Sequence, residues 1–149
     1  MDEAKTTLSK LAGTRYPRDE SHVWGDFFTM RLNSELVVRS MRLYPGGASS
    51  LHQHHPEELV LVTEGSVIFD IGRSAEDLEV LRLGEGDAIH VPSDAVHRVR
   101  AVDSANVPAR ILEFKVGEPL DLRYEIIRLE EAVAGQDPSD VEDVESPIP

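Results

Sequence analysis

Short apolar runs separated by turn-forming residues dominate the sequence from Val23 onward. Runs rich in Val, Ile, Leu and Phe recur between Gly, Pro, Asp and Asn, a pattern typical of an all-β sandwich or barrel. Apart from the two ends of the chain, no run has the length and 3.6-residue period of a substantial helix. The expected strands are residues 24–31, 35–44, 50–65, 66–72, 78–84, 87–92, 97–103, 109–116 and 124–131.

The length and the absence of cysteine narrow the chemistry. A chain of 149 residues fits one domain of ordinary size, so we expect one active centre. Because the sequence contains no cysteine, disulfides, thiolate ligands and cysteine nucleophiles are excluded. Imidazole and carboxylate groups are then the expected metal ligands.

The two ends of the chain differ in composition from its middle. Residues 1–21 are polar and predict a loosely ordered leader, residues 22–131 form the expected domain, and residues 132–149 predict a disordered acidic tail. The N-terminus lacks a secretory signal and no run approaches the length of a membrane span, so we expect a cytoplasmic protein.

The net charge of −13 disfavours nucleic acid and anionic membranes as partners. A DNA-binding role is therefore not expected, and the small-molecule substrate that we expect follows from the resemblance described below. A local basic pocket would still accept an anionic substrate, so charge alone does not exclude a sugar phosphate.

A cluster of ligand-type residues follows Leu51. Side chains at alternate positions of a strand point to one face, so His52 and His54 project together and Glu58 shares their parity. His55 precedes Pro56 at an expected irregularity and is the less favoured ligand. A solvated, histidine-rich bend is the alternative interpretation of this stretch.

Two motifs in this sequence resemble those of the cupin superfamily. The first motif spans Gly46 to Gly65 and contains His52, His54 and Glu58, while the second consists of Gly86, Pro92, Asp94 and His97. Both have the internal spacing and order of that superfamily, although Asp94 stands where glycine is usual. Asp tolerates the turn conformations that glycine adopts.

The resemblance implies a single antiparallel jelly-roll barrel that holds one divalent metal ion. On this chain the implied ligands are His52, His54, Glu58 and His97, and the metal would be Zn, Mn, Fe or Ni. For His97 the alternative is a core or turn histidine bonded to a backbone carbonyl.

A closer resemblance concerns the reaction. Residues 22–131 are similar to the C-terminal cupin half of type II mannose-6-phosphate isomerases. That family usually has Gln where His52 stands, and its residues after the histidines differ from Pro56 to Leu59. The favoured function is a metal-dependent isomerase of a small hydroxy-carbonyl or carbohydrate substrate. The alternatives are a mononuclear iron dioxygenase and a small-molecule-binding cupin without catalysis.

Candidate catalytic residues lie on the strand expected at residues 109–116. Glu113 and Lys115 share one face of that strand with Ile111. If this face turns inward, Glu113 is the expected base, and Lys115 would bind an anion or polarise an oxygen. The alternative is an ion pair on the outer surface. Arg98 and Arg100 alternate with His97, which places them outside the cavity.

Several strands are apolar on both faces, as at residues 37–41, 59–62 and 110–116. A small barrel has one interior, so this surplus predicts a homodimer.

Overall fold

The computed structural model describes residues 22–31, 35–102, 108–117 and 126–136, and every regular element in these ranges is a β-strand. No helix in these ranges is long and apolar enough to cross a membrane. The strands are β1 (Gly25–Arg31), β2 (Leu36–Leu43), β3 (Leu51–His54), β4 (Glu57–Glu64), β5 (Val67–Gly72), β6 (Leu78–Leu83), β7 (Ala88–Val91), β8 (Val96–Ala101), β9 (Ala109–Val116) and β10 (Ile126–Glu130).

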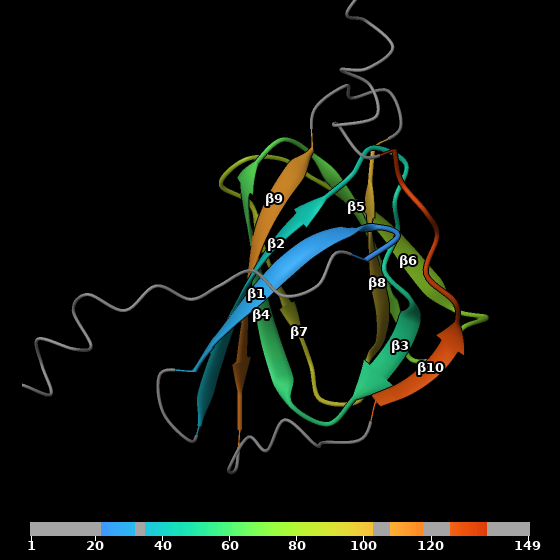
Figure 1. Ribbon diagram of the computed structural model, residues 1–149. Coiled ribbons are helices and arrows are strands. Elements are labelled where there is room, and N and C mark those ends of the chain that lie inside the picture. Colours follow the sequence, from blue (N-terminus) through green and yellow to red (C-terminus); the bar gives the residue numbers. More distant parts are fainter. Residues whose placement is uncertain (1–21, 32–34, 103–107, 118–125, 137–149) are drawn as a thin grey trace, which may run out of the picture.

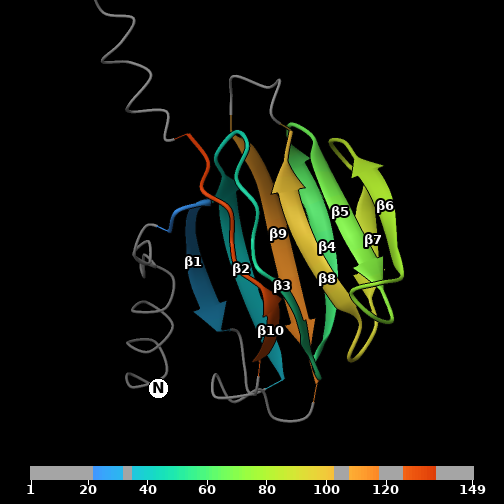
Figure 2. The same cartoon turned by 90° about the vertical axis from the view of Figure 1, so that its right-hand side faces the viewer.

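The strands form two five-stranded antiparallel sheets that face each other (Figure 1). Sheet A has the order β1-β2-β9-β4-β7, and sheet B has the order β10-β3-β8-β5-β6. Figure 2 shows that the edge strands β1 and β10 lie toward one side and β6 and β7 toward the other. This arrangement confirms the expected all-β jelly-roll fold.

The core lies between the two sheets. Its fully buried aliphatic side chains include Leu43, Val60, Val62, Val67 and Val91, which alternate with outward-facing residues along their strands. Burial of a side chain of this size stabilises the fold by about 1.5–3 kcal/mol. The packed core fixes the inward direction of the neighbouring functional side chains.

The single strand expected at residues 50–65 is in fact two strands in different sheets. β3 ends at His54 and pairs with β8 and β10, whereas β4 begins at Glu57 and pairs with β7 and β9. Pro56 has no N–H for a ladder hydrogen bond, which favours this break. The carbonyl of His54 instead accepts a hydrogen bond from the backbone N–H of Asp94. The histidines and Glu58 therefore come from opposite sheets.

The outer face of sheet A is largely apolar. Met30, Val38, Phe114 and Leu59 are successive cross-strand partners on β1, β2, β9 and β4. On β2, β9 and β4 the side chains next to Val38, Phe114 and Leu59 along the strand include the buried ones, so these three point outward. Leu59 is 46% exposed. Sheet A therefore presents apolar side chains on both faces.

The chain after β10 returns to the body of the domain. Val133 and Ala48 exchange two backbone hydrogen bonds, and the N–H of Gln136 donates to the carbonyl of Pro45. Residues 132–136, which we assigned to the disordered tail, are thus paired with the turn that follows β2. The leader at 1–21 and the rest of the tail at 137–149 lie outside the described residues.

Candidate metal centre

Three histidine rings converge inside the domain. His52 and His54 lie on β3 and His97 on the neighbouring β8, where His52 and His97 are direct cross-strand partners. Each ring offers one nitrogen, and these three nitrogens lie within 4.8 Å of one another. His54 and His97 are buried and His52 is partly buried. The spacing and chemistry of this cluster suit a divalent metal ion.

Backbone carbonyls orient all three rings. Nδ1 of His52 lies 2.7 Å from the Ser50 oxygen, Nδ1 of His54 lies 2.9 Å from the Pro56 oxygen, and Nδ1 of His97 lies 2.9 Å from the Ala95 oxygen. A carbonyl only accepts, so each Nδ1 carries the hydrogen and donates it. When the ring is neutral, its Nε2 keeps the lone pair, and this is the form that binds a metal.

Glu58 faces the histidines from β4 in the opposite sheet. Its Oε1 lies 3.0 Å from Nε2 of His54, and its Oε2 lies 3.4 Å from Nε2 of His97. Lys115 Nζ lies 3.3 Å from Oε1. Burial alone would raise the pKa of Glu58, but its contacts with His54, His97 and Lys115 hold this pKa well below its usual range. Glu58 is therefore a buried carboxylate.

The unsatisfied atoms of the cluster fit a metal ion. Among the described residues, Glu58 Oε2 and His97 Nε2 are buried and have no hydrogen-bond partner. Buried polar atoms are rarely left without a partner, because their desolvation is costly. A cation bound by these two atoms would satisfy both, so the residues present fit the expected group.

The protonation of the rings depends on their neighbours. Burial, together with the nearby His97, lowers the pKa of His52 to about 3. Burial would also lower the pKa of His97, but contact with Glu58 raises it above its usual value. His52 is consequently neutral at pH 7, as metal ligation requires.

Glu113 and Lys115 point inward from β9, so the alternative of an outer-surface ion pair is wrong. Their exposed fractions are only 8% and 3%, and the cross-strand partner of Lys115 is Glu58. Burial, and then the charge of Glu58, raise the pKa of Glu113 to about 7 against the opposing effects of Lys115 and Arg39. Both side chains line the same cavity as His52 and His97.

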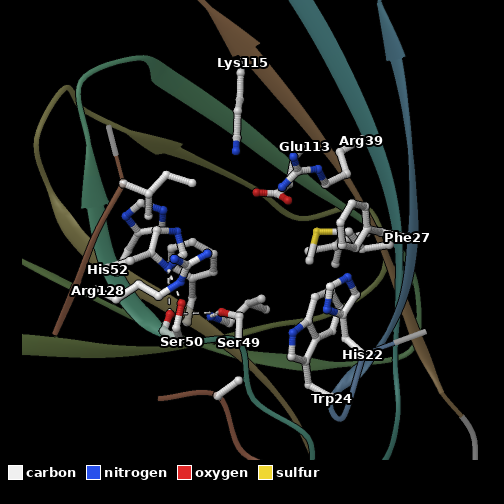
Figure 3. Close-up of a pocket in the computed structure, with 17 residues that line it drawn as sticks. His22, Trp24, Phe27, Arg39, Ser49, Ser50, His52, Glu113, Lys115 and Arg128 are labelled. Atoms are coloured by element: carbon white, nitrogen blue, oxygen red, sulfur yellow. Dashed lines mark hydrogen bonds between the residues drawn. The ribbon is translucent and has the colours of Figure 1, made fainter. Parts of the chain in front are cut away.

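This cavity has a volume of about 240 Å³ and lies beside the histidine cluster (Figure 3). Lining residues come from both sheets, including the edge strands β1 and β10. Sequence reasoning missed the contributions of Arg39, Arg128 and Phe27, and took no signal from His22. For Arg39 the sequence did hold an indication. Arg39 alternates with the apolar residues Met41 and Leu43 on one side of the strand, and both of these are buried in the structure.

Arg42, Arg98 and Arg100 do not line the cavity. Arg98 and Arg100 both bind Asp70, with Nε to Oδ2 distances of 2.7 Å, on the outer face of sheet B. This confirms their expected direction. Arg42 pairs with Asp26, its cross-strand partner on β1.

His55 is the less favoured ligand of the motif, and it points away from the cluster. Its Nδ1 contacts Ser93 Oγ at 3.0 Å and Asp94 Oδ2 at 3.3 Å. Its side chain is 88% exposed. Asp94 itself has a φ of 65°, the turn conformation that the motif usually gives to glycine.

The fold and the histidine cluster define a cupin. The family model described as a cupin domain matches residues 39–115, just over half of the chain, and the chain belongs to this family. No curated protein sequence matches the chain significantly.

Solved structures similar to this chain include oxalate decarboxylase from Bacillus subtilis, with a TM-score of 0.65 and 21% sequence identity over 76% of this chain and 30% of that one. A tryptophan-to-phenylalanine variant of the same enzyme gives a TM-score of 0.64 and 23% identity over 79% of this chain and 31% of that one. A further structure of that enzyme, described with Mn(II) centers, gives a TM-score of 0.64 and 21% identity over 76% of this chain and 30% of that one. The chain thus spans less than a third of these relatives, and the likeness is one of fold. The case for a metal in this chain comes from its own cluster of His52, His54 and His97.

Proposed function

We propose that this cupin is a metal-dependent enzyme that isomerises a small hydroxy-carbonyl or carbohydrate substrate, with Glu58 as the fourth metal ligand beside His52, His54 and His97. The proposal is carried by one observation. The cavity beside the histidine cluster is lined by a carboxyl group, Glu113, and an ammonium group, Lys115, both buried and directed inward.

Interconversion of an aldose and a ketose moves a proton between adjacent carbons and requires a polarised carbonyl. A divalent metal supplies that polarisation when it is bound. Glu113 accepts the proton from one carbon and returns it to the next. Lys115 holds Glu58 in place at 3.3 Å and adds positive charge near the substrate oxygen. The resemblance of residues 22–131 to type II mannose-6-phosphate isomerases favours the same chemistry.

The test begins with elemental analysis of the purified protein. Glyceraldehyde and mannose 6-phosphate are then incubated with the metal-loaded protein in deuterated buffer under nitrogen. Nuclear magnetic resonance follows formation of the ketose and exchange of its C1 proton. The expected result is turnover with zinc or manganese that is lost in Glu113→Gln at unchanged metal content. Glu64→Gln, a change at an exposed carboxylate of sheet A, is the matched control.

Two outcomes would replace this proposal. Oxygen uptake with ferrous iron alone would identify a dioxygenase. Saturable binding without any product would identify a small-molecule-binding cupin.

We also propose a homodimer formed through the outer face of sheet A, supported by the apolar row that includes Leu59 and Phe114. Packing this face against a second copy would remove apolar surface from water. With a net charge of −13, the chain is not expected to bind nucleic acid or anionic membranes.

A further inference from the structure

Arg39 packs against an aromatic ring at the wall of the cavity. Its guanidinium carbon lies 4.5 Å from the centroid of the Phe27 ring. The Phe27 ring in turn stacks with His22, at a centroid distance of 4.8 Å, and with Trp24, at 5.8 Å. The guanidinium therefore has one face covered and its position fixed by a set of stacked rings.

In the part of the chain that the structure describes, one atom of the Arg39 guanidinium, Nε, lacks a hydrogen-bond partner, although the cross-strand neighbour of Arg39 is the acidic Glu113. Among the described residues its Nε atom is buried and makes no hydrogen bond, and Arg39 forms no ion pair within that part of the chain. Burying a charged N–H donor without an acceptor costs free energy, and a bound ligand that supplies the acceptor would remove this cost. Because Phe27 covers the face of the guanidinium, its edge is the part that remains for a partner, and this edge offers parallel N–H groups.

The charge of the cavity differs in sign from that of the chain. Arg39, Arg128 and Lys115, the last of which is paired with Glu58, line the cavity together with one carboxyl group among the described residues, Glu113, whereas the whole chain has a net charge of −13. Arg128 lies on β10 as the cross-strand partner of His52, and Figure 3 shows it across the cavity from Arg39. A cationic cavity in an acidic protein favours an anionic ligand.

We infer that the cavity binds a small organic carboxylate, that Arg39 is the residue that selects for the carboxylate group, and that the rest of the ligand extends toward the three histidines. This deepens the proposed function by naming the substrate class, a small hydroxy or oxo acid, and it rests on that function for the metal end of the ligand. The planar edge of a guanidinium matches a planar carboxylate in a two-bond arrangement. The cavity, with a volume of about 240 Å³, is at the small end of ligand pockets, which suits a small acid.

The experiment compares acids with neutral amides of the same shape. Pyruvate against pyruvamide and benzoate against benzamide are titrated into the metal-loaded protein by isothermal calorimetry, with inorganic phosphate as a separate arm. We expect at least one acid to bind at one site per chain, at least tenfold more tightly than its amide. Arg39→Gln should remove this preference and leave binding of the amide unchanged.

Arg82→Gln is the matched control, because Arg82 is exposed on β6 and its substitution changes the net charge equally. It should retain the full preference for the acid. Arg39→Lys keeps the charge but not the planar edge, so we expect it to recover only part of the preference. If Arg39→Gln does not fold, Arg39→Lys and the wild-type comparison decide the question.

The inference is overturned if no acid binds, if acid and amide bind equally, or if Arg39→Gln matches Arg82→Gln. Tighter binding of phosphate than of any acid would also reject the carboxylate assignment. Metal content is measured on every sample. A protein that holds metal and converts neutral sugars without preferring acids contradicts this inference alone, whereas a protein that holds no metal contradicts the proposed function.

Discussion

Replacement of Asp70 by Asn should destabilise the fold in a pH-dependent way. The Asp70 carboxylate is buried on β5 and accepts hydrogen bonds from Arg98 Nε at 2.7 Å, Arg100 Nε at 2.7 Å and Arg100 Nη2 at 2.9 Å. Asp70→Asn keeps the shape of the side chain but removes its charge. The two arginines, which alternate on β8, are then left without their shared counter-charge.

The size of the expected loss in stability depends on how deeply Asp70, Arg98 and Arg100 are buried. Removing one partner of a fully buried ion pair costs about 3–5 kcal/mol. The side chains of Arg98 and Arg100 are 22% and 34% exposed, so solvent screens part of the loss. We expect Asp70→Asn to lower the free energy of unfolding by about 2 kcal/mol at pH 7.

The pH dependence follows from the pKa of Asp70. Burial would raise this pKa, but the hydrogen bonds and charges of Arg100 and Arg98 hold it below its usual value. A carboxyl whose pKa is lower in the folded than in the unfolded state stabilises the fold above its unfolded pKa, about 3.9. This stabilisation is lost as pH falls through the folded pKa. The difference between wild type and Asp70→Asn should therefore be constant from pH 7 to about pH 5 and shrink at lower pH.

Urea unfolding followed by the fluorescence of Trp24, the single tryptophan and a buried one, measures this difference. Glu64→Gln is the control, because the Glu64–Arg110 pair is about half exposed on both sides and should contribute only about 0–1 kcal/mol. A loss in Asp70→Asn that is the same at pH 3.5 as at pH 7, or no larger than that of Glu64→Gln, would refute the reasoning.

Three further predictions concern the metal, the core and the assembly. His54→Ala should abolish stoichiometric metal in elemental analysis while His55→Ala, a change at an exposed ring, retains it; equal loss in both would contradict the assigned cluster. Leu43→Ala, at a fully buried position, should lower the unfolding free energy by about 2–5 kcal/mol in the same urea assay, and a cost below 1 kcal/mol would argue against its place in the core. Light scattering should give a dimer for the wild type and a monomer for Phe114→Asp, so a monomeric wild type would remove the proposed interface.

The sequence predicted the class of fold and the position of nearly every strand, because apolar runs and turn residues act locally. It did not predict that the chain crosses between sheets at Pro56. The alternation of His52, His54 and Glu58 suggested one continuous strand, whereas Glu58 faces the histidines from the opposite sheet. The break at Pro56 moves the chain from one sheet to the other, but His52, His54 and Glu58 still point into the interior. They therefore meet there from opposite sheets.

Local sequence patterns could not determine which side of a strand points into the interior of the domain. On β9 the more apolar set, Leu112, Phe114 and Val116, lies outside, and Glu113 and Lys115 lie inside. Hydrophobicity alone favours the reverse. The inward direction of Lys115 depends on its partner Glu58 on β4, a contact between residues far apart in the chain. Arg39 was missed for the same reason, since both faces of β2 carry apolar residues.

The metal-ligand candidates and two residues of the cavity wall lie on different kinds of strand, and this affects which substitutions the fold tolerates. The histidines lie on β3 and β8 and Glu58 on β4, and each of these strands is hydrogen-bonded on both sides. Phe27 and Arg128 lie on β1 and β10, which are bonded on one side only. A substitution on a terminal strand disturbs one neighbour instead of two. Substitutions of Phe27 and Arg128 can therefore reshape the cavity wall with little effect on the cation-binding framework, whereas Arg39 lies on β2, which is bonded on both sides. Libraries aimed at new substrates should begin on the two terminal strands and leave β2 unchanged.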